Sequence, residues 1–249
     1  MIEITHLSKR FKQTQALHPL DLSIPSGCIF GLLGQNGAGK TTLLRLLATL
    51  LAPTAGSARI AGLDVATEGL AVRRKLGAVS AGMGVYEKLT GRENLHFFGE
   101  LYGMRKSAVQ ARVIELAQEL AIGAWIDQRA GGYSTGMKQK IVIARAVMHR
   151  PDVLLLDEAT NGLDVLARRA LLDFALSYRA QNKLVIYSTH VMSEAEALCD
   201  RAAILHLGRL VAHDSLENLL QKSGSATLEQ CFISLVSASE RMPEANRHV

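Results

Sequence analysis

The sequence predicts an α/β fold in which a mainly parallel sheet forms the core, an antiparallel β subdomain precedes it and a helical subdomain is inserted in the middle. Three observations indicate this arrangement. Short runs of alternating polar and apolar residues fill the first part of the chain, and a fully apolar run then leads through a glycine-rich turn into a helical pattern. After a long stretch of helical periodicity alone, apolar runs separated by helical segments resume.

The first predicted strands belong to the antiparallel subdomain. Polar and apolar residues alternate in Ile2–Leu7 and in Leu20–Ile24, which is typical of strands with one face in the core. Cys28–Leu33 is apolar throughout and therefore predicts a strand that is buried on both faces. Leucines recur at helical spacing in Lys40–Leu51, directly after the glycine-rich turn, so we expect a helix there.

Residues 91–150 have a different character. Their apolar residues recur at helical spacing, and no strand-like run interrupts them. The predicted helices are Glu93–Leu101, Ala108–Leu120 and Gly136–Met148. Because parallel strands need crossover connections, the three apolar runs that follow, separated by helical segments, indicate that the α/β core resumes. These runs are Val153–Leu156, Leu184–Ser188 and Ala203–Leu205.

These patterns divide the chain into two parts. We expect residues 1–220 to form one unit, made of an α/β core (1–90 and 151–220) and the helical subdomain (91–150). Residues 221–249 are expected to form a short C-terminal helix, over Leu228–Leu235, and a polar tail.

The composition excludes several classes of protein. The 249 residues carry 28 Lys and Arg against 23 Asp and Glu, a net charge of +5, and the basic residues are scattered rather than gathered in a run. No apolar segment approaches the ~20 residues of a membrane-spanning helix, and the charged N-terminus does not predict a secretory signal. Cys28, Cys199 and Cys231 lack metal-ligand spacing, which is typical of free thiols in a reducing compartment.

A phosphate-binding loop follows the buried strand. Residues 34–41, Gly-Gln-Asn-Gly-Ala-Gly-Lys-Thr, match the Walker A pattern between a strand and a helix. Glycines there let backbone N–H groups converge on phosphate oxygens at the positive end of the helix dipole. The sequence therefore predicts a P-loop NTPase (RecA-like) core that binds ATP. The residues expected to contact the nucleotide are Gly34, Asn36, Gly37, Ala38, Gly39, Lys40, Thr41 and Thr42.

Three side chains of this loop have distinct expected roles. Lys40 would reach the β- and γ-phosphates, the Thr41 hydroxyl would bind Mg²⁺, and Thr42 would lie on the α-phosphate side. The alternative is a glycine-rich turn with an incidental lysine, which the strand before it and the helix after it make the weaker interpretation.

An acidic pair ends the first of the later apolar runs. Asp157 and Glu158 follow Val153–Leu156, where the Walker B aspartate of P-loop NTPases holds Mg²⁺. Glu158, one residue further along the chain, would face the position of the γ-phosphate and could polarise an attacking water as a general base. The alternative is that both residues begin a surface loop after an edge strand.

With these motifs in place, the chain resembles the ATP-binding cassette (ABC) ATPase family over residues 2–213. Tyr133–Met137 (Tyr-Ser-Thr-Gly-Met) is similar to the family's signature motif, and its Ser134 lies 23 residues before Asp157. Asn161–Asp164 (Asn-Gly-Leu-Asp) resembles the D-loop, and Ser188–His190 ends a predicted strand where the family has its switch histidine. Phe11 stands at the place of the aromatic residue that stacks on adenine.

The resemblance implies a mechanism in which two copies share ATP. Ser134 and the backbone at Gly136, at a helix N-terminus, would bind the phosphate of ATP held by a second copy, giving a head-to-tail homodimer with ATP between the subunits. His190 would contact the γ-phosphate, and Asp164 would couple the two sites. A structural role is the alternative for His190, and a place in the core is the alternative for Phe11.

Two positions depart from the family pattern. Ala159 replaces the proline that commonly follows the Walker B glutamate, which should loosen the backbone slightly without changing the chemistry. Ala81 stands at the place of the Q-loop glutamine, and a methyl group binds no metal and orients no water. We therefore expect slow hydrolysis in the isolated chain, with coupling to a partner through neighbouring residues.

The resemblance also implies a partner. Single cassettes of this kind are the separate ATP-binding subunits of bacterial transporters, located on the cytoplasmic face of the membrane, and they drive permease subunits on other chains. Residues 189–200 and 80–89 are most similar to the sodium-efflux type among drug and ion exporters. The alternatives are a soluble ABC ATPase of DNA maintenance or translation and a silent nucleotide-binding regulator. The helical subdomain is short for coiled-coil arms, no nucleic acid is expected, and Glu158 argues against a silent regulator.

Overall fold

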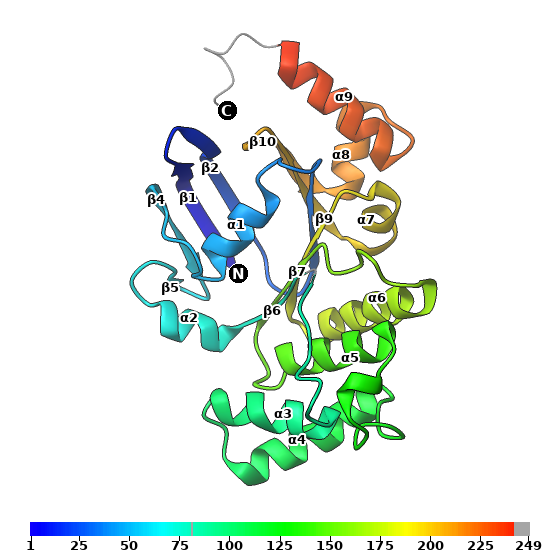
Figure 1. Ribbon diagram of the computed structural model, residues 1–249. Coiled ribbons are helices and arrows are strands. Elements are labelled where there is room, and N and C mark those ends of the chain that lie inside the picture. Colours follow the sequence, from blue (N-terminus) through cyan, green and yellow to red (C-terminus); the bar gives the residue numbers. More distant parts are fainter. Residues whose placement is uncertain (81, 242–249) are drawn as a thin grey trace.

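The computed structural model describes residues 1–80 and 82–241, which form two β-sheets and the helices around them (Figure 1). The larger sheet has six strands in the order β10-β9-β3-β8-β7-β6. All of its neighbouring strands pair in parallel except β10, which pairs antiparallel with β9. The strands are β3 (Ile29–Leu33), β6 (Leu76–Ser80), β7 (Val153–Asp157), β8 (Leu184–Thr189), β9 (Arg201–His206) and β10 (Arg209–Ser215).

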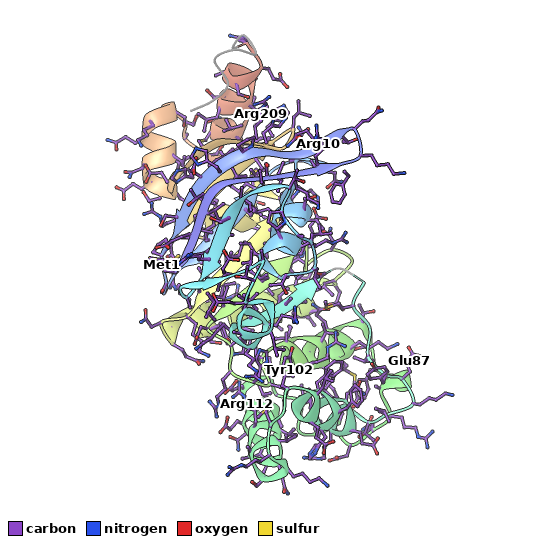
Figure 2. All side chains as sticks on the ribbon, turned by 90° about the vertical axis from the view of Figure 1, so that its left-hand side faces the viewer. Met1, Arg10, Glu87, Tyr102, Arg112 and Arg209 are labelled. Atoms are coloured by element: carbon purple, nitrogen blue, oxygen red, sulfur yellow. The ribbon has the colours of Figure 1, made fainter. Side chains whose placement is uncertain are left out.

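The smaller sheet is antiparallel, with the strand order β2-β1-β4-β5. Both predicted N-terminal strands are longer than expected, because the β1–β2 ladder continues to the pair Phe11 and Thr14. Figure 2 shows this hairpin projecting from the molecule, with Arg10 near its tip. The strands are β1 (Ile2–Phe11), β2 (Thr14–Ile24), β4 (Ala55–Ile60) and β5 (Leu63–Asp64).

One helix, α1 (Lys40–Leu47), lies between the two sheets (Figure 1). Its buried leucines belong to one hydrophobic core together with the inner face of the antiparallel sheet and one face of the parallel sheet. The helix ends four residues before the predicted end at Leu51. Thr49 adopts a positive φ of 60°, a left-handed conformation that stops a helix, and Leu50 is 68% exposed.

The helical subdomain contains α3 (Gly91–Leu101), α4 (Lys106–Glu119) and α5 (Thr135–Ala146). A capping box begins α3: the Thr90 side chain accepts a hydrogen bond from the Glu93 N–H, and the Glu93 carboxylate accepts one from the Thr90 N–H. Buried apolar residues of all three helices join the core on the other face of the parallel sheet.

The remaining α-helices pack on the parallel sheet or on the elements beside it. They are α2 (Gly69–Lys75), α6 (Val165–Ala180), α7 (Met192–Leu198), α8 (Leu216–Ser223) and α9 (Leu228–Arg241). Helix α2 contacts both β5 and β6, and α9 contacts α7, α8 and β10. The C-terminal helix is longer than the predicted Leu228–Leu235, and the predicted limit at residue 220 lies inside α8. No helix in the described part of the chain is long and apolar enough to cross a membrane.

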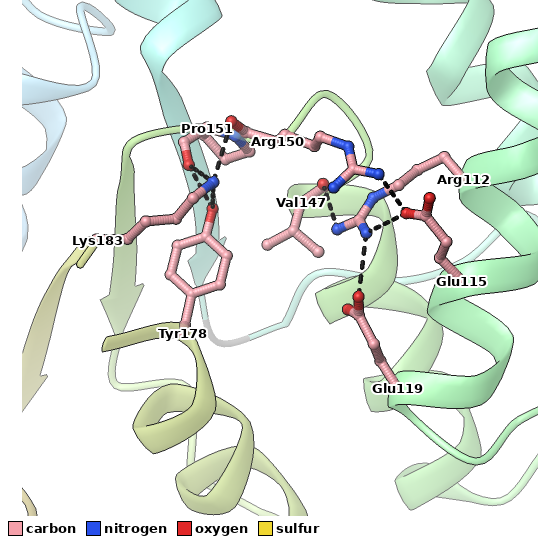
Figure 3. A network of polar contacts seen from close by, with 8 residues as sticks. All are labelled: Arg112, Glu115, Glu119, Val147, Arg150, Pro151, Tyr178 and Lys183. Carbon is pink, nitrogen blue, oxygen red and sulfur yellow. Dashed lines mark hydrogen bonds and ion pairs between the residues drawn. The ribbon is translucent and has the colours of Figure 1, made fainter. Parts of the chain in front are cut away.

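A polar junction connects the helical subdomain to the start of β7 (Figure 3). Arg112 of α4 is almost fully buried, and it donates to Glu115 and Glu119 and to the carbonyl oxygen of Val147 at the end of α5. Glu115 also pairs with Arg150, which immediately precedes the strand connection at Pro151. The junction therefore joins α4, α5 and the segment that leads into β7.

Candidate functional site

The sheet order brings three predicted motifs to one edge. The strands β3, β8 and β7 are neighbours and run in parallel, so their carboxyl ends lie at the same edge of the sheet. The glycine-rich loop follows β3, Asp157 and Glu158 lie at the end of β7, and His190 follows β8. Ligands of open α/β sheets bind at this edge.

The glycine-rich loop lines a cleft of about 600 Å³. Gly37 and Gly39 have positive φ angles of 82° and 104°, which favour glycine. A Cβ at Gly39 would lie 2.7 Å from Leu17 Cδ2, so a larger residue would also collide with β2. The loop residues that line the cleft are Asn36, Gly37, Ala38, Gly39, Lys40, Thr41 and Thr42. Gly34 is not among the lining residues.

The Lys40 ammonium group is buried at the base of this cleft. It donates to the carbonyl oxygens of Gly34 (2.7 Å) and Gln35 (3.1 Å) and lies 3.3 Å from Glu158 Oε1. These contacts hold a positive charge beside backbone N–H groups and the N-terminus of α1. The arrangement favours a bound anion.

Two oxygen atoms, one from the first turn of α1 and one from the end of β7, meet next to the loop. The Thr41 hydroxyl donates to Asp157 Oδ1 over 3.2 Å, although 116 positions separate the two residues. Thr41 is the second residue of α1 and Asp157 ends β7, so their contact depends on the strand order rather than on the local sequence. A hydroxyl and a carboxylate are donors that suit Mg²⁺.

Glu158 is held in an unusual conformation. Its φ is +48°, a left-handed angle that is uncommon for a residue with a side chain. The Glu158 N–H donates to the Ser188 carbonyl oxygen (3.1 Å), and the Asn161 side-chain amide donates to Glu158 Oε2 (2.7 Å). His190 Nδ1 lies 3.7 Å from Glu158 Oε1. Glu158, Lys40 and His190 therefore lie together.

Sequence reasoning missed one wall of the cleft. The start of β2 and the β9–β10 turn contribute Thr14, Gln15, Ala16, Leu207 and Gly208. The Gly208 N–H donates to the Ala38 carbonyl oxygen (3.0 Å), so the turn is bound directly to the phosphate loop. The only signal in the sequence was the glycine of this turn, whose place beside a distant loop depends on the pairing of β9 with β3.

Phe11 does not line the cleft. Its ring is 42% exposed, and Lys9 Nζ lies 5.1 Å from the ring centroid. Phe11 pairs with Thr14 in the hairpin, and Thr14 does line the cleft. The ring is thus one strand away from the cleft wall.

The signature and D-loop residues lie outside the cleft, at the exposed ends of two packed helices. Ser134 caps the N-terminus of α5 and accepts a hydrogen bond from Met137 N–H (3.3 Å), and Asp164 caps α6 in the same way through Ala167 N–H (2.8 Å). A Cβ at Gly136 would lie 3.2 Å from Ala167 Cβ, so the two helix ends lie close together. Neither Ser134 nor Asp164 meets Glu158 or Lys40 in this single chain.

Of the two residues that depart from the family pattern, the structure describes only Ala159. Ala159 is buried, and its carbonyl oxygen accepts a hydrogen bond from the Gln139 side chain of α5 (3.4 Å). Ala81 lies outside the described residues.

Comparison with known proteins agrees with these motifs. The profile of the family described as "ABC transporter" matches residues 17–161, more than half of the chain. The ABC transporter ATP-binding protein NatA of Bacillus subtilis (strain 168) is 37% identical over 239 residues, 94% of this chain and 97% of that protein. The daunorubicin/doxorubicin resistance ATP-binding protein DrrA of Streptomyces peucetius is 38% identical over 227 residues, 91% of this chain and 69% of that protein.

A solved structure shows the same fold. An ATP-binding subunit of an ABC transporter superposes with a TM-score of 0.85 at 29% identity, covering 95% of this chain and 99% of its own. This match confirms the predicted α/β P-loop fold, and the sequence matches confirm the family that the motifs indicated. The chain belongs to the ABC transporter family and is one of its ATP-hydrolysing ATP-binding proteins.

Proposed function

We propose that this chain is the ATPase subunit of a membrane exporter, and that it powers transport of an ion or a drug through separate permease subunits. The observation that carries the proposal is the meeting of Lys40, Glu158 and His190 at one edge of the parallel sheet, beside the phosphate loop. The name of NatA, an ABC transporter ATP-binding protein, supports the transport role, and the drug-resistance name of DrrA supports a drug as the substrate.

Each group at the edge of the sheet has a proposed chemical role. The N–H groups of the loop and Lys40 bind the β- and γ-phosphates, and Lys40 then exchanges its contacts with the Gly34 and Gln35 carbonyl oxygens for phosphate oxygens. Glu158 accepts a proton from the attacking water. His190 donates to the γ-phosphate, and Phe11, beside the cleft wall, stacks on the adenine.

Thr41 and Asp157 fit a magnesium ion, because their oxygen atoms converge within 3.2 Å beside the phosphate loop. We propose that these two residues hold Mg²⁺ together with the phosphates of ATP. The ion would neutralise phosphate charge during hydrolysis.

We also propose a homodimer with ATP between the subunits. The exposed caps Ser134 and Asp164, together with Gly136, lie away from the chain's own cleft and are free to meet the nucleotide of a second copy. The helix N-terminus at Ser134 suits a phosphate anion.

The permease subunits are proposed to dock in a second cleft, of about 350 Å³, between the core and the helical subdomain. Its wall is mainly apolar and includes exposed Leu50 and Tyr102, and Figure 2 shows Tyr102 at this boundary. Arg145 adds a cation whose guanidinium carbon lies 4.5 Å from the centroid of the Phe98 ring. Docking there would place the chain on the cytoplasmic face of the membrane.

A pull-down from detergent-solubilised membranes tests whether the chain binds a permease subunit. The chain used as bait should recover a strongly hydrophobic polypeptide, and the Leu50→Asp variant should no longer recover it. Leu70→Asp is the matched control, because Leu70 is 63% exposed on α2, close to the 68% of Leu50, yet does not line the docking cleft. Recovery of nucleic acid or ribosomes instead, or equal loss in both variants, would contradict the proposal.

A further inference from the structure

A buried polar cluster lies behind the phosphate edge of the sheet, outside the groups that the proposed reaction uses. Its members are Thr160, after β7, Arg168 of α6, Tyr187 of β8 and Glu194 of α7. Thr160, Tyr187 and Glu194 are all buried, and Glu194 is only 9% exposed. A carboxylate at such a depth is stable only when it is paired and hydrogen-bonded.

Glu194 is the centre of the cluster. Its Oε2 accepts hydrogen bonds from the Tyr187 hydroxyl and from the Thr160 hydroxyl (3.2 Å), and these two hydroxyls lie 3.2 Å apart. Its Oε1 makes an ion pair with Arg168 Nη1 (3.3 Å) and has no hydrogen bond within residues 1–80 and 82–241. Burial, and next the hydrogen bond to Glu194, raise the pKa of Tyr187, so the phenol stays protonated and donates.

Each partner of Glu194 lies within one turn or a few residues of a proposed functional residue. Thr160 is two positions after Glu158, and Arg168 is one helical turn after Asp164 on α6. Tyr187 is three positions before His190, and Glu194 itself is four positions after it. One carboxylate therefore joins the three segments that carry Glu158, Asp164 and His190.

The backbone gives this link a direct effect on the site. Ser188 is the residue after Tyr187 in β8, and its carbonyl oxygen accepts a hydrogen bond from the Glu158 N–H. The positions of β8 and of Glu158 therefore depend on each other. The positive φ of Glu158 requires such support, because an uncommon backbone conformation persists only where its surroundings hold it.

We propose that Glu194 is a positioning residue for ATP hydrolysis. By binding Thr160, Tyr187 and Arg168 together, it fixes the separation of Glu158 and His190 and connects this pair to the α6 terminus that carries Asp164. The inference rests on the proposed hydrolytic function of the site. It assigns Glu194 no contact with ATP.

Steady-state kinetics with matched variants test the proposal. Glu194→Ala should lower kcat about 10- to 100-fold, the effect of a small misplacement of reacting groups, while the Kd for ATP changes by less than about twofold. Tyr187→Phe removes one hydroxyl of the cluster without changing the ring, and should lower kcat by about threefold to tenfold.

Tyr178→Phe is the control, because Tyr178 is also buried and loses a hydroxyl that donates to the Pro151 carbonyl oxygen at the other end of β7 (Figure 3). It should lower thermal stability as Tyr187→Phe does, yet keep the wild-type kcat. A reduced kcat with Tyr178→Phe as large as with Tyr187→Phe would show that lost stability, not positioning, explains the effect, and would overturn the proposal.

If Glu194→Ala does not fold, a kinetic double-mutant cycle between Tyr187→Phe and Thr160→Val tests the positioning role of Glu194 instead. The combined loss of kcat should be smaller than the product of the single losses, because both hydroxyls act through the same carboxylate oxygen. Unchanged kcat in both single variants would overturn the inference alone. Absence of ATP hydrolysis in the wild-type protein would instead contradict the proposed function.

Discussion

At the scale of the residue, Glu158 depends on Asn161, the first residue of the predicted D-loop, to which the sequence assigned no role of its own. Asn161 donates its side-chain amide to Glu158 Oε2 over 2.7 Å and so fixes the carboxylate that is proposed to accept the proton of water. We expect Asn161→Ala to lower kcat about tenfold, the size of one lost hydrogen bond to a charged group, with little change in the Kd for ATP. A coupled ATPase assay with a separate nucleotide titration measures both, and an unchanged kcat would show that Glu158 does not need this donor.

His149 makes the fold sensitive to acid. Its ring stacks on Tyr102 with 3.8 Å between centroids, and its Nε2 lies 2.9 Å from the Leu76 carbonyl oxygen. Burial lowers the pKa of His149, so the unfolded chain binds a proton more readily than the folded one. Stability from the neutral ring is therefore present above the unfolded pKa of about 6.5 and is lost as pH falls below it towards the folded pKa.

The His149→Phe variant isolates this effect, because phenylalanine keeps an aromatic ring and cannot be protonated. Between about pH 7.5 and about pH 5.5 the Tm of the wild-type protein should fall more than that of the variant. Thermal unfolding of both proteins at the two pH values checks it, and parallel decreases would contradict the role of His149.

The site residues that the sequence predicted lie in contiguous motifs, whereas those that it missed reach the cleft through contacts between distant segments. The glycine loop and the pair Asp157 and Glu158 are short contiguous patterns whose local geometry restricts the residue types, so the sequence could predict them. Ala16 of β2 and Gly208 of the β9–β10 turn reach the same cleft from distant parts of the chain, and their approach depends on packing of β2 against this turn. No local pattern encodes such a contact.

At the scale of the element, the polar junction around Arg112 should stabilise the packing of α4 against the end of α5 and the segment that leads into β7. Arg112→Met keeps much of the buried stem and removes the bond to the Val147 carbonyl oxygen and the charge-assisted bonds to Glu115 and Glu119, so we expect a loss of about 2 kcal/mol in the free energy of unfolding. Arg169→Met is the matched control: Arg169 pairs with Asp173 on the surface of α6, is 76% exposed, and should cost about 0.5 kcal/mol or less. Urea unfolding compares them, and equal losses would contradict a special role for the junction.

The spacing of apolar residues predicted which helices and strands exist more accurately than it predicted the residues at which they end. Helices were found wherever apolar residues recurred at helical spacing, but α1 stops at Leu47 because the backbone turns at Thr49, although leucines continue to Leu51. The β1–β2 ladder extends beyond the alternating runs, because backbone pairing continues through polar residues near the hairpin tip. The short strands β4 and β5 carry too little pattern to be recognised alone.

At the scale of the whole molecule, the chain has its nucleotide-binding and signature surfaces on different parts of its structure. The phosphate cleft lies at the edge of the parallel sheet, whereas Ser134 and Asp164 cap α5 and α6 outside it. In the proposed homodimer, each copy would provide two complementary halves of a site, and a second copy would bring them together. This division is what the proposed head-to-tail dimer requires, because the signature surface of one copy would have to meet the cleft of the other.

We propose that Glu158 drives the hydrolysis of ATP bound between two copies, and the Glu158→Gln variant is the sharpest test of this role. The variant keeps a side chain of the same size but cannot accept the proton of water, so ATPase activity should fall at least about 100-fold. With saturating ATP and Mg²⁺, light scattering should show a dimer of Glu158→Gln that ADP does not produce and that Lys40→Ala abolishes. Retained ATPase activity would show that Glu158 is not the general base, and a Glu158→Gln variant that stays monomeric with ATP would show that ATP does not join two copies.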